Sequence, residues 1–160
     1  MGDTIGQNKN GNGSYDFSEA NYNAGKCGKG HYLTSDIPQG YDIYDAARAN
    51  MGSPWRMPTK AQCQELIDNT TSTWTTINGV NGRKFSSKKD STKYIFLPAG
   101  GWWVETAHYN KEQYGYSWTT SWSSSTQSYL LYFISTGSLT TGVSYRYWGF
   151  PVRARSQSSL

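Results

Sequence analysis

The 160-residue sequence predicts a single α+β domain, because a segment with helical periodicity is followed by segments with strand periodicity. Apolar residues recur at helical spacing between residues 42 and 69, and after Asn69 they alternate with polar residues. Clusters of Gly, Pro, Asn and Ser divide the later apolar residues into short runs. We therefore expect two short helices, several short antiparallel strands and irregular loops in the last third.

The amino end differs in composition from the rest of the chain. Residues 1–25 are rich in Gly and Asn and lack periodicity, which is typical of a loosely ordered lead-in or a linker. Residues 26–156 carry the apolar pattern and form the expected domain.

Two helices are expected first. Apolar residues at helical spacing predict a helix over residues 42–51, which Gly52 ends. A second helix is expected over 59–69, because Thr59 and Gln62 have the spacing of a capping box directly after a proline. Its buried stripe would consist of Cys63, Leu66 and Ile67.

The strands follow. Residues 72–85 alternate around Asn78-Gly79 and Asn81-Gly82, and both pairs are strong tight-turn signals. An apolar run at 94–97 stops at Pro98 and the glycines after it. Further short strands are expected over residues 114–121, 128–134 and 147–155.

Charge and hydropathy exclude several classes of protein. The formal net charge is only +4, and the one local basic cluster is typical of a solvated hairpin tip, so we expect no nucleic-acid partner. No apolar run approaches the ~20 residues that span a membrane. The basic cluster consists of Arg83, Lys84, Lys88, Lys89 and Lys93.

Catalytic and metal-binding patterns are weak. Cys27 and Cys63 lack the spacing of a zinc site, and they could form a disulfide or remain two thiols. The only histidines are His31 and His108, and the pair of His108 and Glu105 has no positioned nucleophile. The Gly-rich segment around Cys27 lacks the ending of a phosphate-binding loop. We expect no catalytic residues, no metal and no cofactor.

The segment 101–150 has an unusual composition. It holds 14 of the 25 aromatic residues and 16 Ser or Thr, but only four charged residues. Rigid Tyr and Trp among small hydroxyl residues are typical of antibody-like contact surfaces.

Period-two alternation divides this segment into two sets. The residues in phase with the strands are expected in the core: Tyr114, Tyr116, Trp118, Tyr129, Leu131, Phe133, Phe150 and Val152. The residues between them and in the loops are expected on an exposed ligand-binding face, where an apolar Leu130 or Ile134 would have no role in folding. This set comprises Trp102, Trp103, Glu105, Thr106, His108, Tyr109, Ser117, Trp122, Thr126, Gln127, Leu130, Ile134, Thr140, Ser144, Tyr145 and Trp148.

Four fragments within residues 41–155 carry a resemblance to a known family: WRMPTKAQCQELID, TWTTINGVNGRKF, IFLPAGG, and the segment from YGYSWTTS to the closing RYWGFPVRAR. In this order they resemble the Fibrobacter-type major paralogous domains, which belong to the formylglycine-generating-enzyme-like branch of the C-type lectin fold. The resemblance implies a C-type lectin fold. The calcium-binding loop strings of sugar-binding lectins and the paired C-terminal cysteines of the formylglycine-generating enzyme are missing from this sequence.

Several members of that branch are variable proteins of diversity-generating retroelements, so the resemblance implies a hypervariable region at about 101–150. Adenine replacement in an Asn codon cannot yield Trp, Gln or Glu, so those residue types would be fixed members of the face or derive from other codons. The implied function is non-enzymatic ligand binding, as in receptor binding or adhesion by a phage or bacterial surface display protein.

The implied partner is a protein or glycan on a target surface, and a homo-oligomer is possible. We expect an extracellular location, on a cell surface or a virion, with any export signal or upstream domain outside this sequence. Two alternatives stay open: a structural cell-surface domain without programmed variation, and a calcium-independent lectin that binds glycans.

Overall fold

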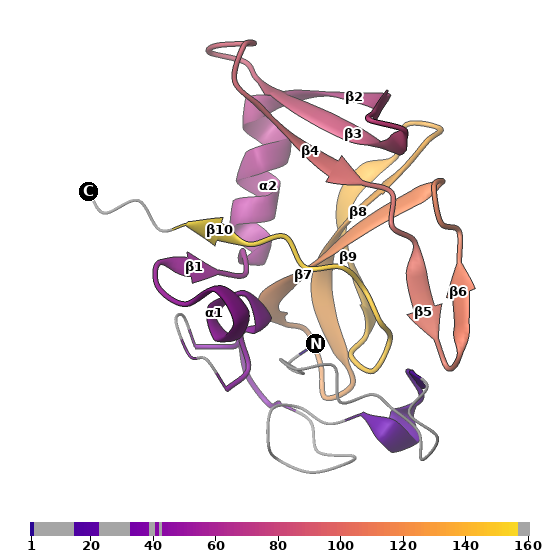
Figure 1. Cartoon of the computed structure of the whole chain (residues 1–160). Helices are drawn as coiled ribbons and strands as arrows, with labels where there is room; N and C mark the ends of the chain where they lie inside the picture. Colours follow the sequence, from indigo (N-terminus) through magenta and orange to yellow (C-terminus); the bar gives the residue numbers. More distant parts are fainter. Residues whose placement is uncertain (2–14, 23–32, 39–40, 42, 157–160) are drawn as a thin grey trace.

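The computed structural model describes residues 1, 15–22, 33–38, 41 and 43–156. This part of the chain contains two α-helices and mostly antiparallel strands, as the sequence predicts (Figure 1). The elements, in chain order, are η1 (Glu19–Asn21), α1 (Ala46–Met51), β1 (Trp55–Arg56), α2 (Lys60–Asn69), β2 (Thr70–Ile77), β3 (Val80–Ser87), β4 (Tyr94–Pro98), β5 (Trp102–Val104), β6 (Ala107–Tyr109), β7 (Tyr114–Trp122), β8 (Gln127–Ile134), β9 (Leu139–Tyr145) and β10 (Arg155–Ser156).

Side-chain caps start both α-helices. The predicted capping box of α2 is confirmed, because the Thr59 hydroxyl accepts a hydrogen bond from the Gln62 amide at 3.2 Å and the Gln62 side chain accepts one from the Thr59 amide at 3.0 Å. α1 begins later than predicted, since the Asp45 carboxylate accepts from the first amides of the helix and fixes the start there. Gly52, with a φ of 71°, ends α1 as expected.

One of the two predicted tight turns joins β2 to β3. Asn78 and Gly79 have positive φ angles of 50° and 78° and connect the two strands. The prediction of a second turn at Asn81-Gly82 is wrong, because both residues lie within β3. A Cβ on Gly82 would lie 2.3 Å from the carbonyl oxygen of Leu97, so this glycine allows β4 to approach closely instead.

The three-stranded sheet β7–β8–β9 occupies the centre of the molecule (Figure 1). In Figure 1 the β2–β3–β4 sheet and α2 lie above it, the β5–β6 hairpin lies to one side, and α1, β1 and β10 lie to the other. Strand β8 pairs with β7 on one edge and with β9 on the other, so its backbone is enclosed on both sides.

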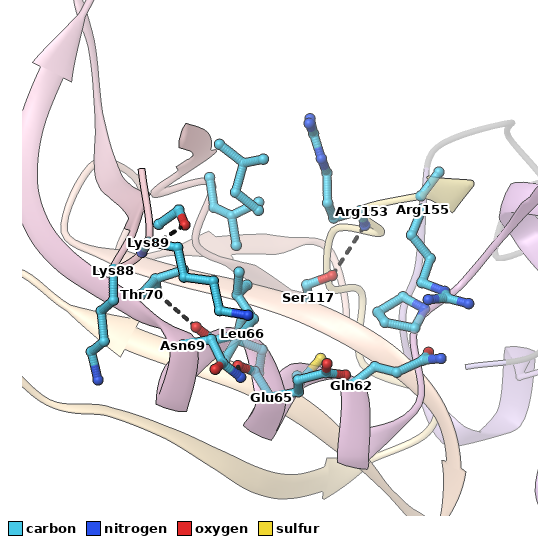
Figure 2. Close-up of a pocket in the computed structure, with 17 residues that line it drawn as sticks. Gln62, Glu65, Leu66, Asn69, Thr70, Lys88, Lys89, Ser117, Arg153 and Arg155 are labelled. Atoms are coloured by element: carbon cyan, nitrogen blue, oxygen red, sulfur yellow. Dashed lines mark hydrogen bonds between the residues drawn. The ribbon is translucent and has the colours of Figure 1, made fainter. Parts of the chain in front are cut away.

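One face of the central sheet packs against α2 and the β2–β3–β4 sheet. Apolar side chains form a buried cluster at this interface, in which Phe133 of β8 is fully buried. A Cβ on Gly115 of β7 would lie only 1.9 Å from the Phe133 ring. Packing is incomplete near the carboxyl end of the chain. A cavity of about 740 Å³ opens there between α2 and residues 153–155 (Figure 2). The buried members of the cluster are Cys63, Phe85, Leu97, Leu131 and Phe133.

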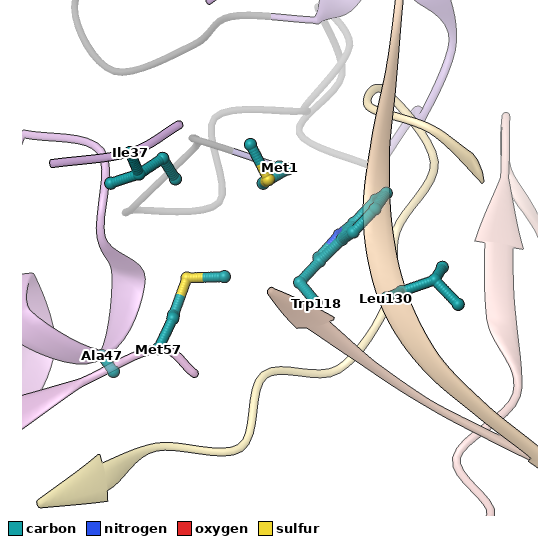
Figure 3. Close-up of a cluster of buried hydrophobic side chains, with 6 residues drawn as sticks. All are labelled: Met1, Ile37, Ala47, Met57, Trp118 and Leu130. Atoms are coloured by element: carbon teal, nitrogen blue, oxygen red, sulfur yellow. The ribbon is translucent and has the colours of Figure 1, made fainter. Parts of the chain in front are cut away.

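The opposite face of the central sheet packs against a second cluster (Figure 3). The prediction that Leu130 is exposed is wrong: only 3% of the residue is accessible, because its side of β8 is also covered. The prediction that Ser117 is exposed is also wrong: this residue is 3% exposed and lies on the α2 side of β7. The buried members of this cluster are Met1, Ile37, Ala47, Met57, Trp118 and Leu130.

The predicted strand over residues 147–155 is wrong, since only Arg155–Ser156 are paired as a strand. Pro151 has no amide hydrogen, so a continuous ladder cannot pass through it. The segment instead makes isolated backbone hydrogen bonds. Gly149 and Trp103 exchange a pair of them, at 2.8 and 2.9 Å. Val152, which was predicted to lie in the core, is 38% exposed, because this segment runs along the surface instead of continuing the sheet.

The structure contains two strand regions that the sequence pattern did not predict. The β5–β6 hairpin and strand β9 fall in segments that were expected to be loops. Of the predicted lead-in, residues 1 and 15–22 are described, and Phe17 pairs with Glu105 through a backbone bond of 2.8 Å. Cys27 and His31 lie outside the described residues, whereas Cys63 is a buried free thiol.

The basic cluster is only partly the solvated hairpin tip that was predicted. Lys88, Lys89 and Lys93 lie in the loop between β3 and β4, whereas Arg83 and Lys84 lie within β3. Arg83 is 6% exposed and donates to the Ser72 hydroxyl at 3.0 Å and to the Ile134 carbonyl at 3.2 Å. Burial lowers the pKa of Arg83, which is a structural residue between two sheets.

Candidate ligand-binding surface

A continuous chain of aromatic ring contacts crosses the side of the central sheet that is remote from α2. We call this chain the aromatic band. Its rings are half-buried or exposed, and each has its centroid within 6.5 Å of another member. The members are Trp102, Tyr109, Tyr114, Tyr116, Tyr132, Tyr145, Tyr147, Trp148 and Phe150.

Strand alternation builds the centre of the band. Tyr114 and Tyr116 are two residues apart on β7, so their side chains project to the same side. Tyr132 of β8 is directly opposite Tyr116, and the two ring centroids are 5.2 Å apart. Phe150 covers the inner end of this row, 4.7 Å from Tyr116 and 4.9 Å from the buried Trp118.

The predicted core residues therefore divide into two groups. Trp118, Leu131 and Phe133 are buried, as predicted. The other aromatic residues of that set are only half-buried and remain accessible at the surface: Tyr114, Tyr116, Tyr129 and Phe150.

The β5–β6 hairpin contributes aromatic rings from both of its sides. On one side, Trp102 stacks on Tyr109 at 5.6 Å and meets Tyr116 edge-on at 5.4 Å, which joins the hairpin to the band. On the other side, Trp103 stacks on His108 at 4.5 Å. Glu105 and Thr106 are exposed at the tip of the hairpin.

The segment after β9 extends the band to the edge of the sheet. Trp148 lies 6.2 Å from Phe150 and 5.5 Å from Tyr145, and Tyr145 stacks on Tyr147 at 5.5 Å. Tyr145 is 41% exposed, in agreement with its predicted position on an accessible surface.

Small hydroxyl residues border the rings. The register pairs Thr140 with Tyr132, and Ser144 with Ser128, so both hydroxyls lie on the band side of β9. Ile134 is opposite Tyr114 and is half-buried beside it. The structure thus brings together the following predicted contact residues: Trp102, Tyr109, Ile134, Thr140, Ser144, Tyr145 and Trp148.

Trp122 and Thr126 lie elsewhere, around the buried Arg146, whereas Gln127 is directly opposite Tyr145 in the β8–β9 pair, at the end of the band. The guanidinium of Arg146 donates to the carbonyls of Ser124 and Gln127 at 2.9 and 3.2 Å, and its backbone amide donates to Thr126. The indole of Trp122 donates to the Leu33 carbonyl at 3.1 Å. In the described part of the chain no ring contact joins Trp122 to the band.

Tyr132 and Tyr147 are members of the band that the sequence pattern did not assign to the contact face. Tyr132 has the same parity on β8 as Leu130 and Ile134, which were both placed on the contact face, so the alternation could have identified it. Tyr147 joins the band only through the course of the segment after β9, for which the sequence holds no comparable signal.

Three hydroxyls of the band, those of Tyr116, Tyr132 and Tyr147, are neutral hydrogen-bonding groups. Burial, followed by the proximity of Tyr132 and Tyr114, raises the pKa of Tyr116 above its ordinary value. Burial is also the main cause that raises the pKa of Tyr132 and of Tyr147. The band can therefore donate and accept hydrogen bonds at neutral pH without carrying charge.

His108, the histidine of the predicted contact set, makes a structural hydrogen bond. Nε2 of His108 donates to the Gly100 carbonyl oxygen at 2.7 Å, so this ring nitrogen is occupied by a structural bond. Within the described ranges, no three His, Cys, Asp or Glu side chains are grouped so that they could hold a metal ion. In that same part of the molecule, neither α-helix is long and apolar enough to cross a membrane.

No protein-family model, curated protein or solved structure matches this chain.

Proposed function

We propose that this chain is a non-enzymatic display domain whose aromatic band binds a protein or glycan on a target surface. The observation that carries the proposal is the band itself: a continuous row of accessible Tyr and Trp rings without a charged member. Apolar rings exposed in one connected patch are typical of interaction sites.

The chemistry of the band suits binding to varied partners. Tyr and Trp bury a large area while losing few rotamers, and their polar atoms allow hydrogen bonds at the contact. Thr140 borders the rings with a small exposed side chain that a larger residue could replace without disturbing the core. A rigid sheet beneath the band lowers the entropic cost of binding.

The resemblance described above supports a more specific form of this proposal: a C-type lectin fold that serves as the variable protein of a diversity-generating retroelement. In this form, the positions that vary are accessible ones at the hairpin tip and along the band. Ser117 and Leu130 are excluded from that set, because both are buried under neighbouring strands. Display on a cell surface or virion in several copies would strengthen weak single contacts.

The DNA around the coding region tests this form directly. We expect a non-coding near-copy of the codons for about residues 101–150, next to a reverse-transcriptase gene, with differences almost only where the copy has adenine. The codons of Ser117 and Leu130 should match the copy. If flanking DNA has no such copy, the chain is better explained as a structural surface domain without programmed variation.

A calcium-independent lectin is the second candidate, because the exposed stack of Trp102 on Tyr109 offers flat rings to a sugar. A glycan array of the native chain and two variants decides it. Trp102→Ala should abolish glycan binding, while Trp103→Ala, on the opposite side of the same hairpin, should retain it. An array on which the native chain binds no glycan would remove this candidate and leave a protein as the ligand.

A further inference from the structure

The cavity beside α2 is separate from the aromatic band. It is lined by one side of α2, by β4, and by Ser117 and Leu131, whose side chains point to the α2 side of the central sheet (Figure 2). Its volume of about 740 Å³ lies within the range of small-molecule sites. The central sheet separates the cavity from the band, so a ligand in one does not contact the other.

The floor of the cavity is apolar. Leu66 of α2, Ile95 and Leu97 of β4 and Leu131 of β8 supply most of it. The nearby Cys63 thiol is neutral, because burial raises its pKa to about 12. The one hydroxyl contributed by β7, that of Ser117, accepts a hydrogen bond from the Arg153 amide at 3.0 Å and is therefore satisfied. An apolar group entering this space would gain contact area without stranding a polar partner.

The rim of the cavity is strongly basic. Lys88, Lys89, Arg153 and Arg155 line it, against a single carboxylate from Glu65. Among the described residues no carboxylate forms an ion pair with any of these four cations. Lys88 donates to the Asp68 carbonyl at 2.6 Å, at the end of α2, whereas the side chains of the other three make no hydrogen bond to any residue that the structure describes. The rim therefore favours an anionic ligand.

Arg155 is the cation best placed to bind the anion. It is opposite Arg56 in the β1–β10 pair, so two guanidinium groups project from the same side of this ribbon. Arg56 is 6% exposed, and in the described structure its Nη2 and the buried Nε of Arg155 have no hydrogen-bond partner. A buried donor without a partner is unfavourable, and an anion bound in the cavity would satisfy that of Arg155, which lines it. Figure 2 places Arg155 at the Gln62 end of the cavity.

We propose that this cavity binds a small amphipathic anion. Its apolar body lies along Leu66, Ile95, Leu97 and Leu131, and its anionic group is bound by Arg155. Arg155 and the other cations of the rim select the charge, and the apolar floor selects the body.

Calorimetric titration of the full chain with three matched probes tests the charge selection. Decanoate, decan-1-ol and decyltrimethylammonium share the same ten-carbon chain and differ in the head group. We expect decanoate to bind at least about tenfold more tightly than the alcohol, the difference that one charged hydrogen bond supplies, and the cation to bind most weakly. Equal affinities for decanoate and decanol would overturn the proposal.

Variants of the chain locate the head group. Arg155→Gln should weaken decanoate binding at least about tenfold, while Lys93→Gln, which removes the same charge from a lysine outside the cavity, should leave it unchanged. Glu65→Gln removes the only carboxylate of the rim from an exposed helical position, so it should fold normally and tighten binding about two- to fivefold. Unchanged affinity in Arg155→Gln, or weaker binding in Glu65→Gln, would contradict the assignment even if the other variant unfolds.

Discussion

Leu130 and Leu131 are neighbours on β8, and their side chains project to opposite sides of the sheet, yet the two residues are only 3% and 1% exposed. Leu131 packs with the α2-side cluster and Leu130 with Trp118 and Met57 on the other side. Strand alternation identifies the core face of a sheet only when the other face meets water. β8 is covered on both faces, so a leucine out of phase with its neighbours belongs to a second core.

Replacement of Leu130 by Ala tests this conclusion at the level of one residue. The variant should lose about 2–5 kcal/mol of unfolding free energy, because a fully buried side chain leaves a cavity beside Trp118. Ile134→Ala removes as many carbon atoms from the same side of the same strand, but at a half-buried position, and should lose less than about 2 kcal/mol. Urea denaturation followed by circular dichroism measures both. Equal, small losses would mean that Leu130 is accessible.

At the scale of elements, α2 supports both the core and the proposed anion site. Its Cys63 is buried against the central sheet, while Gln62, Glu65 and Leu66 line the cavity. The position of these residues depends on where the helix starts, which the capping box at Thr59 determines.

Removal of this cap has a defined expected cost. Thr59→Ala should reduce the unfolding free energy by about 0.5–2 kcal/mol, because the Gln62 amide loses its acceptor. Thr59→Ser keeps the hydroxyl and should stay within about 0.5 kcal/mol of the native chain. Thermal denaturation of the three proteins provides the comparison. A serine variant as unstable as the alanine variant would show that the methyl group, rather than the hydrogen bond, is responsible.

The elements that could be predicted from the sequence are those whose signals are local. The capping box of α2 and the Asn78-Gly79 turn each depend on residues within four positions of one another. The hairpin at residues 102–109 and the course of 147–154 depend instead on each other, through the bonds between Trp103 and Gly149. For the aromatic band, composition singled out residues 101–150, the segment that supplies all of its rings. Membership of the band required the register of three strands, which placed Tyr114 and Tyr116 at the surface rather than in the core.

For the whole molecule, the central sheet separates two accessible regions of different character. The aromatic band lies on one side and has neutral hydrogen-bonding groups, whereas the cavity beside α2 lies on the other and has a basic rim. The buried Arg146 donates to three carbonyls, that of Leu33 and those of Ser124 and Gln127 around the β7–β8 turn, and so fixes the end of the sheet. This rigidity allows residues of the band to change while the fold is retained.

The two sides share a response to alkaline pH. Burial raises the pKa of Cys63 from 9.0 to about 12, and it raises the pKa of Tyr116 above 10.0. Above pH 9 the unfolded chain loses these protons while the folded chain keeps them. The unfolding free energy therefore keeps its full value below pH 9 and decreases as the pH rises toward 12. Urea titrations at pH 8, 9, 10 and 11 should show this decrease. Cys63→Ala should make it shallower from pH 9 upward, and Tyr116→Phe only above about pH 10, where an unperturbed tyrosine begins to ionise. A native chain with the same midpoint at pH 8 and pH 11 would show that neither group is protected from water in the folded protein.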